Sequence, residues 1–424
     1  MSEAGGGRLV LSREGWLLFV ARAVRAFGFG WLSIVLALYL AQRGFSSTEI
    51  GAAFTATMVE DALLTMLLSV VATRIGPARV MVLTAPLIAV GGVLLAIADA
   101  RWLLLLGAVL GTLSPNGQEA GPFSSMELAL LPGAVTSGSR TRVFGWYNVF
   151  GFLPAALGAL TAGTSLGWAL ERGVQEITAY RLMLWAYSGA GVVLTVVYLR
   201  LAGLPQRGPA PPPQGRVGAL GLHRSRGVVL QLAGLQAVDA LAGGFIMQSL
   251  LAYWFHLRFG VGPGALGALF FGTNLLSALS FLLATRIADR VGLLNTMVFT
   301  HLPSNVLLVL VPFMPSFTAA ASVLLLRHVL SQMDVPTRQA YTMALVAPEE
   351  RPAAAGLTGS ARALAQACAP FVSGATMAVA ATGAPFFLSG GLKIVYDLAL
   401  FFRFRRVPLP EEGWTPPKAP TPPV

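Results

Sequence analysis

The sequence predicts an all-α integral membrane protein with twelve transmembrane helices arranged as two six-helix bundles. Hydrophobic residues make up 55% of the 424 residues, and charged residues only 11%. A soluble chain carries about 25% charged residues, so too few remain here to solvate a globular surface. Two further observations support the prediction: a series of long apolar runs, and polar motifs that recur in both halves.

Each long apolar run is a candidate membrane span, because about 20 apolar residues let one helix cross the hydrocarbon core. Gly or Pro interrupts several runs, which membrane bundles tolerate when neighbouring helices bind the freed backbone groups. Twelve spans are expected, at residues 15–41, 47–72, 79–98, 102–130, 142–166, 178–200, 228–256, 263–286, 293–312, 317–346, 354–381 and 384–403.

An internal repeat relates the two halves of the chain. Arg74 and Arg290 lie 216 positions apart, and so do Gly76 and Gly292. The same offset relates three further pairs: Pro132 and Pro348, Pro154 and Pro370, and Gly158 and Gly374. A parallel duplication of about six spans is typical of transporters built from two related bundles.

The loops between the spans alternate in charge. One set of loops, together with the termini, carries most of the arginines, whereas the other set holds only Arg43, Arg101, Arg172 and Arg258. The positive-inside rule therefore places both termini in the cytoplasm, which agrees with an even number of spans.

The spans and the proline-rich stretches divide the chain into five parts. Proline lacks a backbone donor and stiffens the chain, so the proline-rich parts are expected to be an extended linker and a disordered tail. The five parts are a cytoplasmic N-terminus at 1–14, an N-terminal bundle at 15–200, a cytoplasmic linker at 201–227, a C-terminal bundle at 228–405 and a tail at 406–424.

Several other classes of function are disfavoured. The net charge of +11 lies largely in short loops, so topology explains it better than nucleic-acid binding does. One cysteine, Cys368, and four histidines without close ligand spacing disfavour a disulfide or a metal site. The sequence has neither an ATP-binding Gly-Lys-Ser/Thr loop nor a nucleophile–base motif, so we expect no enzyme and no cofactor.

A short motif follows the second and the eighth span. The later copy reads Asp289-Arg290-Val291-Gly292, and the earlier copy keeps Arg74 and Gly76 but has Thr73 in place of the acid. With its twelve spans and long central loop, the chain resembles the major facilitator superfamily over about residues 15–405. The resemblance implies a gating role for Arg74, Gly76, Asp289, Arg290 and Gly292.

The tenth and fifth spans refine the resemblance. The string from Ser331 to Tyr341 is similar to that of a subset of bacterial members. The fifth span, with Gly151 and Pro154 separated by two residues, lacks the Gly-Pro pair of the drug exporters in the family. The resemblance implies a monomer in the plasma (inner) membrane of a bacterium.

Ionisable side chains inside the spans are the candidate pathway residues, since each costs about 2.5–3.5 kcal/mol at the bilayer centre unless it is paired or hydrated. In the family that the chain resembles, the first, fourth, seventh and tenth helices line the cavity. The candidates are Arg22, Arg25, Glu119, Asp239, Arg327, Asp334 and Arg338 on these spans, and Glu60 and Asp61 on the second.

Helical spacing suggests how these groups pair. Arg22 is expected near Glu119, and Arg25 near Glu60 or Asp61, which form either a proton site or a static ion pair. Arg338 follows Asp334 by four residues, so the two can bond directly in a substrate site, a gate or a structural lock. Lys393 and Asp397 have the same spacing and are expected to neutralise each other.

These observations predict a secondary active transporter that moves a small organic solute by alternating access, with protons as the coupling ion and export favoured. The bilayer, protons and a small-molecule substrate are its expected partners. The alternative substrate is an anionic metabolite or a sugar that is imported with the help of Arg22 or Arg25. The alternative from another class is a non-transporting membrane sensor or assembly factor on the same fold.

Overall fold

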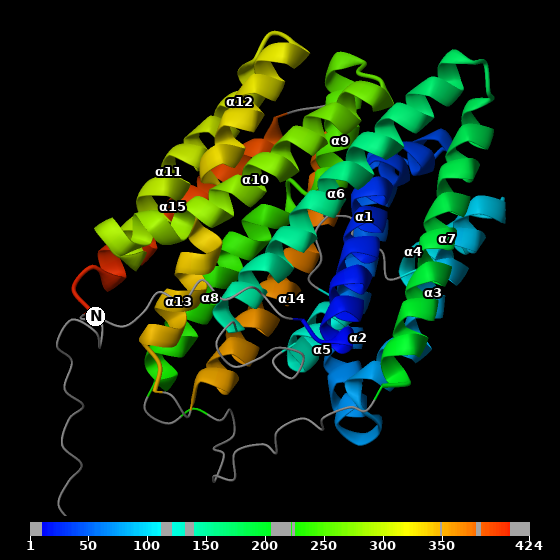
Figure 1. The fold of residues 1–424 in the computed structure, drawn as a ribbon. Helices are drawn as coiled ribbons and strands as arrows, with labels where there is room; N and C mark the ends of the chain where they lie inside the picture. Colours follow the sequence, from blue (N-terminus) through cyan, green and yellow to red (C-terminus); the bar gives the residue numbers. More distant parts are fainter. Residues whose placement is uncertain are drawn as a thin grey trace, which may run out of the picture.

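The computed structural model describes residues 11–111, 121–131, 140–204, 222, 225–347, 350–378 and 383–407 (Figure 1). The fold is all-α. The N-terminal bundle contains α1 (Arg13–Gln42), α2 (Ser47–Ile75), α3 (Pro77–Ile97), α4 (Arg101–Leu110), α5 (Pro122–Leu130), α6 (Arg140–Glu171) and α7 (Glu176–Ala202). The C-terminal bundle contains α8 (Arg226–Gly244), α9 (Gln248–Phe259), α10 (Pro263–Val291), α11 (Leu293–Leu310), a 3₁₀ turn (Val311–Phe313), α12 (Phe317–Leu330), α13 (Asp334–Ala344), α14 (Arg351–Met377) and α15 (Ala384–Phe404). The prolines of the linker and the tail beyond Val407 lie outside the described residues.

The repeated glycines have a conformational reason. Gly76 joins α2 to α3 with φ of 90°, and Gly292 joins α10 to α11 with φ of 85°. Side chains with a Cβ are strained at such angles, whereas glycine is not. The motif that recurs in the sequence therefore marks two equivalent tight turns, and we call this side of the molecule the signature end.

Two of the predicted spans are broken rather than continuous: the seventh is interrupted at Phe245–Met247 and the tenth at Ser331–Met333. In the fourth span α4 ends at Leu110 and α5 begins at Pro122, and residues 112–120 lie outside the described part of the chain. Pro336 explains the second break, because its ring would clash with the carbonyl of Gln332 if α12 continued. Discontinuous helices at mid-depth are typical of transporter binding sites.

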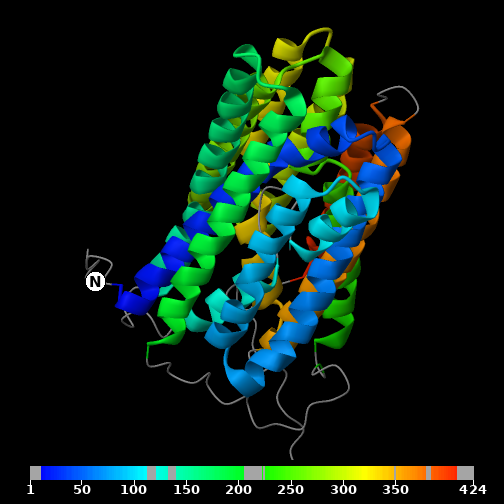
Figure 2. The same cartoon turned by 90° about the vertical axis from the view of Figure 1, so that its right-hand side faces the viewer.

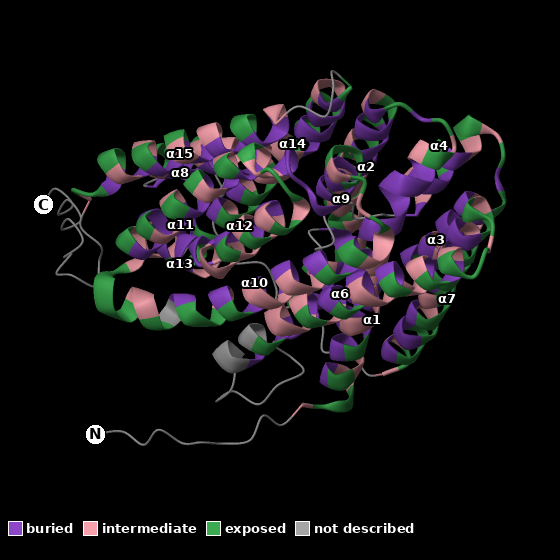
Figure 3. Ribbon diagram, turned by 90° about the horizontal axis from the view of Figure 1, so that it is seen from above, coloured by how far each residue is buried: buried purple, intermediate pink, exposed green. Residues whose placement is uncertain are grey.

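Membrane character is evident in the described helices. Nine stretches, among them Arg226–Phe259 across the α8–α9 break, are long and apolar enough to span a bilayer. The other three predicted spans correspond to α4 with α5, α12 with α13, and α14. Large apolar side chains such as Leu63 and Met66 on α2 are exposed, as lipid-facing positions require. Figure 3 marks exposed positions on helices of both bundles.

The two bundles meet through α6 with α10 and α2 with α14 (Figure 2). A Cβ on Gly51 would lie 2.3 Å from the carbonyl oxygen of Pro370, and one on Gly163 would lie 2.7 Å from the Cα of Gly267. Glycine thus lets the backbones approach closely. These residues lie near the helix ends farthest from the signature end, so the bundles are joined at the opposite end.

Candidate substrate cavity

A cavity of about 410 Å³ lies between the bundles. From the N-terminal bundle it is lined by Arg22 and Ala26 on α1 and by Asn148, Gly151 and Phe152 on α6. The rest of its described lining comes from the C-terminal bundle. The site is therefore asymmetric, although the two bundles are related by an internal repeat.

The cavity is accessible from the signature end. Gln339, a lining residue near the signature end of α13, is exposed, whereas Gln248 and Leu251 on α9 are only 8% and 4% exposed. Gln248 Nε2 also donates to Ser33 Oγ across the bundles at 2.6 Å. The cavity is thus closed at the opposite end of the molecule.

Positive charge dominates the described lining. Its carboxylates are Asp239 and Asp334. Its permanent cations are Arg22, Arg327, Arg338, Arg362 and Lys393. Even without Arg22, four cations face two carboxylates, so the described lining has an excess of positive charge when its histidines are neutral.

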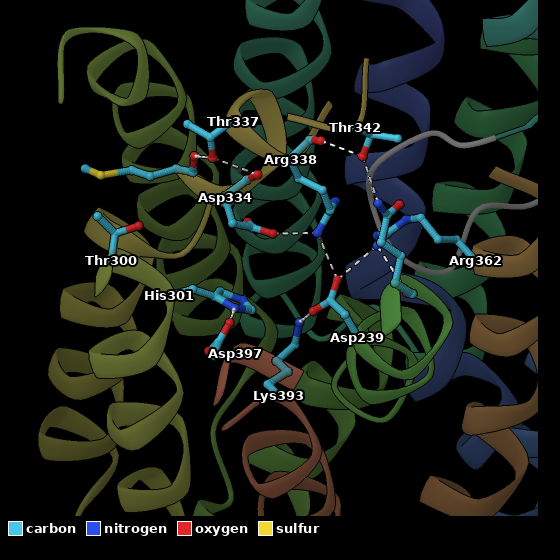
Figure 4. Close-up of polar contacts among 12 residues, drawn as sticks. Asp239, Thr300, His301, Asp334, Thr337, Arg338, Thr342, Arg362, Lys393 and Asp397 are labelled. Carbon is cyan, nitrogen blue, oxygen red and sulfur yellow. Dashed lines mark hydrogen bonds and ion pairs between the residues drawn. The ribbon is translucent and has the colours of Figure 1, made fainter. Parts of the chain in front are cut away.

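Asp239 is the hub of the charged cluster (Figure 4). Its Oδ2 accepts from Arg338 Nη1 at 2.9 Å and from Arg362 Nη1 at 3.0 Å, and its Oδ1 accepts from Lys393 Nζ at 2.6 Å. The four side chains come from α8, α13, α14 and α15. One buried carboxylate thereby ties four helices of the C-terminal bundle together. The sequence did not identify Arg362 and Lys393 as partners of Asp239, because spacing along one helix does not show which side chains of other helices lie nearby.

Asp334 extends this cluster along α13. Arg338 Nη1 donates to Asp334 Oδ2 at 2.5 Å, and it bonds Asp239 as well. The i, i+4 spacing anticipated this bond. Arg338 therefore bridges the two cavity carboxylates, and all three side chains are buried.

Arg327 differs from the other cavity cations. Its side chain is buried, and no carboxylate of the described residues lies within ion-pair distance of it. Its Nη1 lies 3.3 Å from Nε2 of His328, whose Nδ1 lies 3.0 Å from Ser277 Oγ. Its Nε has no hydrogen-bond partner in the described part of the chain. A buried guanidinium with spare donors can bind an anion.

The N-terminal bundle holds a separate ion pair. Arg25 Nη1 and Nη2 donate to Glu127 Oε1 and Oε2 at 2.9 and 2.7 Å, and both side chains are fully buried. Tyr147 and Tyr198 also donate to Glu127, at 2.6 and 2.7 Å. Glu127 was missed by the sequence analysis, although it is an isolated carboxylate in an apolar run.

The carboxylates that were expected to pair with Arg25 are Glu60 and Asp61 on α2. The carboxylate that binds both terminal nitrogens of Arg25 is Glu127, so the predicted pairing with Glu60 or Asp61 is corrected. Asp61 Oδ1 would lie 2.7 Å from a Cβ on Gly121, and both α2 carboxylates are half-buried outside the cavity lining. Packing of α5 against α2 and α3 brings Glu127 inward instead.

Arg22 reaches the cavity from α1. Its guanidinium carbon lies 4.8 Å from the ring centre of Tyr147, and Gly151 leaves space for it, because a Cβ there would lie 2.5 Å from Arg22 Nη2. A cation over an aromatic face is favourable. Its expected partner Glu119 lies outside the described residues.

The signature residues are solvent-accessible in this state. Arg74, Asp289 and Arg290 are exposed, and none of them has an ion pair among the described residues. Because the bundles are separated at this end, a bond that closes it would form only in the other state. The gating role of these residues and of the turns at Gly76 and Gly292 remains a prediction.

The predicted pairing of Lys393 with Asp397 is wrong. Lys393 bonds Asp239, while Asp397 Oδ1 lies 2.8 Å from His301 Nδ1 and its Oδ2 accepts from Asn305 at 2.9 Å. The two residues do lie one helical turn apart on α15. Stronger partners on α8 and α11 separate them, which spacing within one helix cannot reveal.

An all-α fold of two related bundles around a central polar cavity defines a multi-pass membrane transporter. The family profile of the Major Facilitator Superfamily matches residues 18–333, and the chain belongs to this family. It is a transporter, not an enzyme.

Similar proteins agree with this assignment. An uncharacterized membrane protein of Saccharomyces cerevisiae is 24% identical over 423 residues, covering 93% of this chain and 94% of the relative. The nucleoside transporter NupG has a TM-score of 0.72 at 13% identity and covers 92% of this chain and 100% of its own. The human organic anion transporter MFSD10 has a TM-score of 0.65 at 16% identity, covering 92% of this chain and 100% of its own. At these identities the solved structures show a shared fold.

Proposed function

We propose that this transporter moves a small organic anion by alternating access. The observation that carries the proposal is the excess of positive charge around the cavity, and above all Arg327, a buried cation with no carboxylate at ion-pair distance in the described part of the chain. A buried charge without a counter-ion is costly, and an anionic ligand offsets that cost. The substrate therefore supplies the charge that the site lacks.

The size and polarity of the cavity limit the substrate further. A volume of about 410 Å³ lies within the range of about 300–1,000 Å³ that is typical of small-molecule sites. Asn148, Asn274 and Gln248 add amide groups to the lining, and Phe152 and Phe281 add apolar surface. A carboxylate, phosphate or sulfonate attached to a compact organic body fits this combination.

The charge of the substrate bears on the direction of transport. Across a membrane that is negative inside, about 2.3 kcal/mol per 100 mV drives each negative charge outward. Export thus requires no further energy source, whereas accumulation of the anion inside the cell requires coupling to another gradient, and protons are the coupling ion that we propose. A cavity with excess positive charge supports the anionic alternative from the sequence, and we infer proton-coupled uptake in place of the export first expected.

The orientation in the membrane is part of the proposal. The distribution of arginines places the signature end, both termini and the 201–227 linker in the cytoplasm of a bacterial cell. The state described above is then inward-facing. A reporter fused to the linker should report a cytoplasmic location, and a periplasmic signal would contradict the orientation.

A thermal-shift screen tests the substrate class. Purified protein is melted with a panel of small carboxylates, phosphates and sulfonates, each paired with an uncharged analogue such as its amide or ester. A ligand that binds the native state raises the melting temperature, so the anions should stabilise and their uncharged analogues should not. Equal stabilisation by both members of each pair would refute the proposal.

The variant Arg327→Gln sharpens the test, with Arg258→Gln as its control because Arg258 is exposed and lies outside the cavity lining. Loss of a charged hydrogen bond of about 1.5–3 kcal/mol should weaken binding of the stabilising anion by about tenfold or more. Flux into liposomes then separates a transporter from a non-transporting sensor, because a sensor would bind the anion without moving it.

A further inference from the structure

A polar cluster between α11 and α15 adjoins the substrate cavity. His301 Nδ1 lies 2.8 Å from Asp397 Oδ1, and Asn305 Nδ2 donates to Asp397 Oδ2 at 2.9 Å. His301 is 2% exposed, and Asp397 and Asn305 are fully buried. Neither helix belongs to the four spans that were expected to line the cavity. Nevertheless, His301 on α11 and Lys393 on α15 are both lining residues.

The chemistry of this cluster suits reversible proton binding. Imidazole is the side chain whose ordinary titration falls near neutral pH. When His301 takes up a proton, Nδ1–H donates to the Asp397 carboxylate and the pair carries no net charge. Asn305 fixes the second carboxylate oxygen, and its own Oδ1 has no hydrogen-bond partner among the described residues.

Lys393 connects the cluster to the cavity. It precedes Asp397 by one helical turn on α15, so its ammonium can reach Asp397, but in this structure it bonds Asp239 at 2.6 Å. Asp239 and Asp397 therefore compete for one cation. Which of the two carboxylates binds Lys393 depends on whether a protonated His301 neutralises the charge of Asp397.

We propose that His301 and Asp397 form the proton-binding site of this transporter, and that Lys393 transmits the charge of that site to the cavity. The inference rests on the proposed proton-coupled transport of an anion. It locates the proton on two helices outside the central four rather than on the cavity carboxylates.

The charges balance in both states. With the proton bound, His301 and Asp397 neutralise each other, and Lys393 stays on Asp239 beside Arg338. When the proton leaves, Asp397 carries an unbalanced negative charge and attracts Lys393 away from the cavity. The cavity then loses positive charge where an anion would bind. Because coupling between two sites is reciprocal, proton and anion strengthen each other's binding, as co-transport in one direction requires.

Charged neighbours surround the cluster on several helices. α13 supplies Arg338 and Asp334, and α14 supplies Arg362. Other facing or nearby groups are Asp239 on α8, Arg327 and His328 on α12, and Tyr396 on α15. Arg338 and Arg362 also bond Asp239, so the hub would keep two partners if Lys393 moved to Asp397.

Nitrogen-15 NMR of the histidine rings tests the site without any substrate. The full chain carries four histidines, and His301→Asn identifies the His301 signal. If His301 binds the proton, this signal changes with pH. In Asp397→Asn the midpoint should fall by about one pH unit or more, because the counter-charge is gone. In Lys393→Met it should rise, because a nearby positive charge is removed.

Opposite shifts in the two variants distinguish a proton site from a structural contact. A His301 signal that does not move with pH, or a midpoint unchanged in Asp397→Asn, would overturn the inference. Neither result depends on transport, so the anion proposal is tested separately. If a stabilising anion is found but its melting shift has the same pH dependence in wild type and His301→Asn, anion binding stands and this proton site fails.

Discussion

Gly51 and Gly267 occupy equivalent positions of the repeat, 216 residues apart, and each brings its helix against a glycine of the other bundle. Gly51 on α2 packs against Gly374 on α14, and Gly267 on α10 packs against Gly163 on α6. The two contacts close the same end of the molecule. A single duplicated feature thus forms both halves of the closed gate.

The first prediction is that Gly51→Ala opens this gate. Its Cβ would lie 2.3 Å from the Pro370 carbonyl oxygen, so α2 and α14 must separate. In a Cys368→Ser background, a cysteine at Leu251 should become more reactive toward a small thiol reagent. Gly189→Ala is the matched control, because nothing lies within 4 Å of its Cβ position. Equal labelling in both variants would show that the contact does not hold the gate.

The second prediction concerns the Asp239 hub. Asp239→Asn leaves three cations, Arg338 and Lys393 buried and Arg362 partly buried, with a weaker acceptor, which should destabilise the protein by about 3–5 kcal/mol. Thermal unfolding in detergent measures the loss. Adding Lys393→Met should recover part of it, because one unpaired cation is removed. A double variant less stable than the single one would contradict the charge argument.

A third prediction tests the buried pair of the N-terminal bundle. Glu127→Leu leaves Arg25 uncompensated and should lower stability by about 3–5 kcal/mol, whereas Glu171→Leu on an exposed position should have little effect. The double variant Arg25→Met, Glu127→Leu should be more stable than Glu127→Leu alone. Additive losses in the double-mutant cycle would mean that the pair is not energetically linked.

The fourth prediction addresses the signature end. Asp289 has no ion pair with any residue that the structure describes, so a bond that it makes when this end closes would stabilise only the other state. Asp289→Asn should therefore keep the cavity open here, and a cysteine at Gln339 should be labelled faster than in wild type. Thr73→Ala serves as the comparison, since Thr73 Oγ1 only donates to Val70 within its own helix. A larger effect of Thr73→Ala would refute the gate.

The fifth prediction is a pH effect outside the membrane spans. A hydrogen bond from Arg43 and the charge of Arg181 lower the pKa of Asp99, in the loop between α3 and α4. A carboxylate with a lowered pKa stabilises the fold above its unfolded value of about 3.9, and this contribution is lost as the pH falls further. Melting curves from pH 3 to 7 should therefore show a slightly smaller acid-induced loss in Asp99→Asn. The effect should be small because Asp99 is exposed.

Features that depend on neighbours along the chain could be predicted from the sequence. Apolar composition set the membrane class, glycine at Gly76 and Gly292 set two turns with positive φ, and the i, i+4 spacing set the bond between Asp334 and Arg338. The repeat offset and the signature motif pointed to the family. These properties follow from local stereochemistry and from the cost of placing polar groups in lipid.

Which charges meet across helices depends on the packing of the folded protein and could not be predicted from the sequence. Arg25 bonds Glu127, 102 residues away, and Lys393 bonds Asp239, 154 residues away, in preference to Asp397 on its own helix. The rotation and tilt of each helix determine such partners, and these depend on the packing of whole bundles through small residues. A list of buried ionisable residues therefore identifies candidates, whereas their pairing emerges only when the helices are packed.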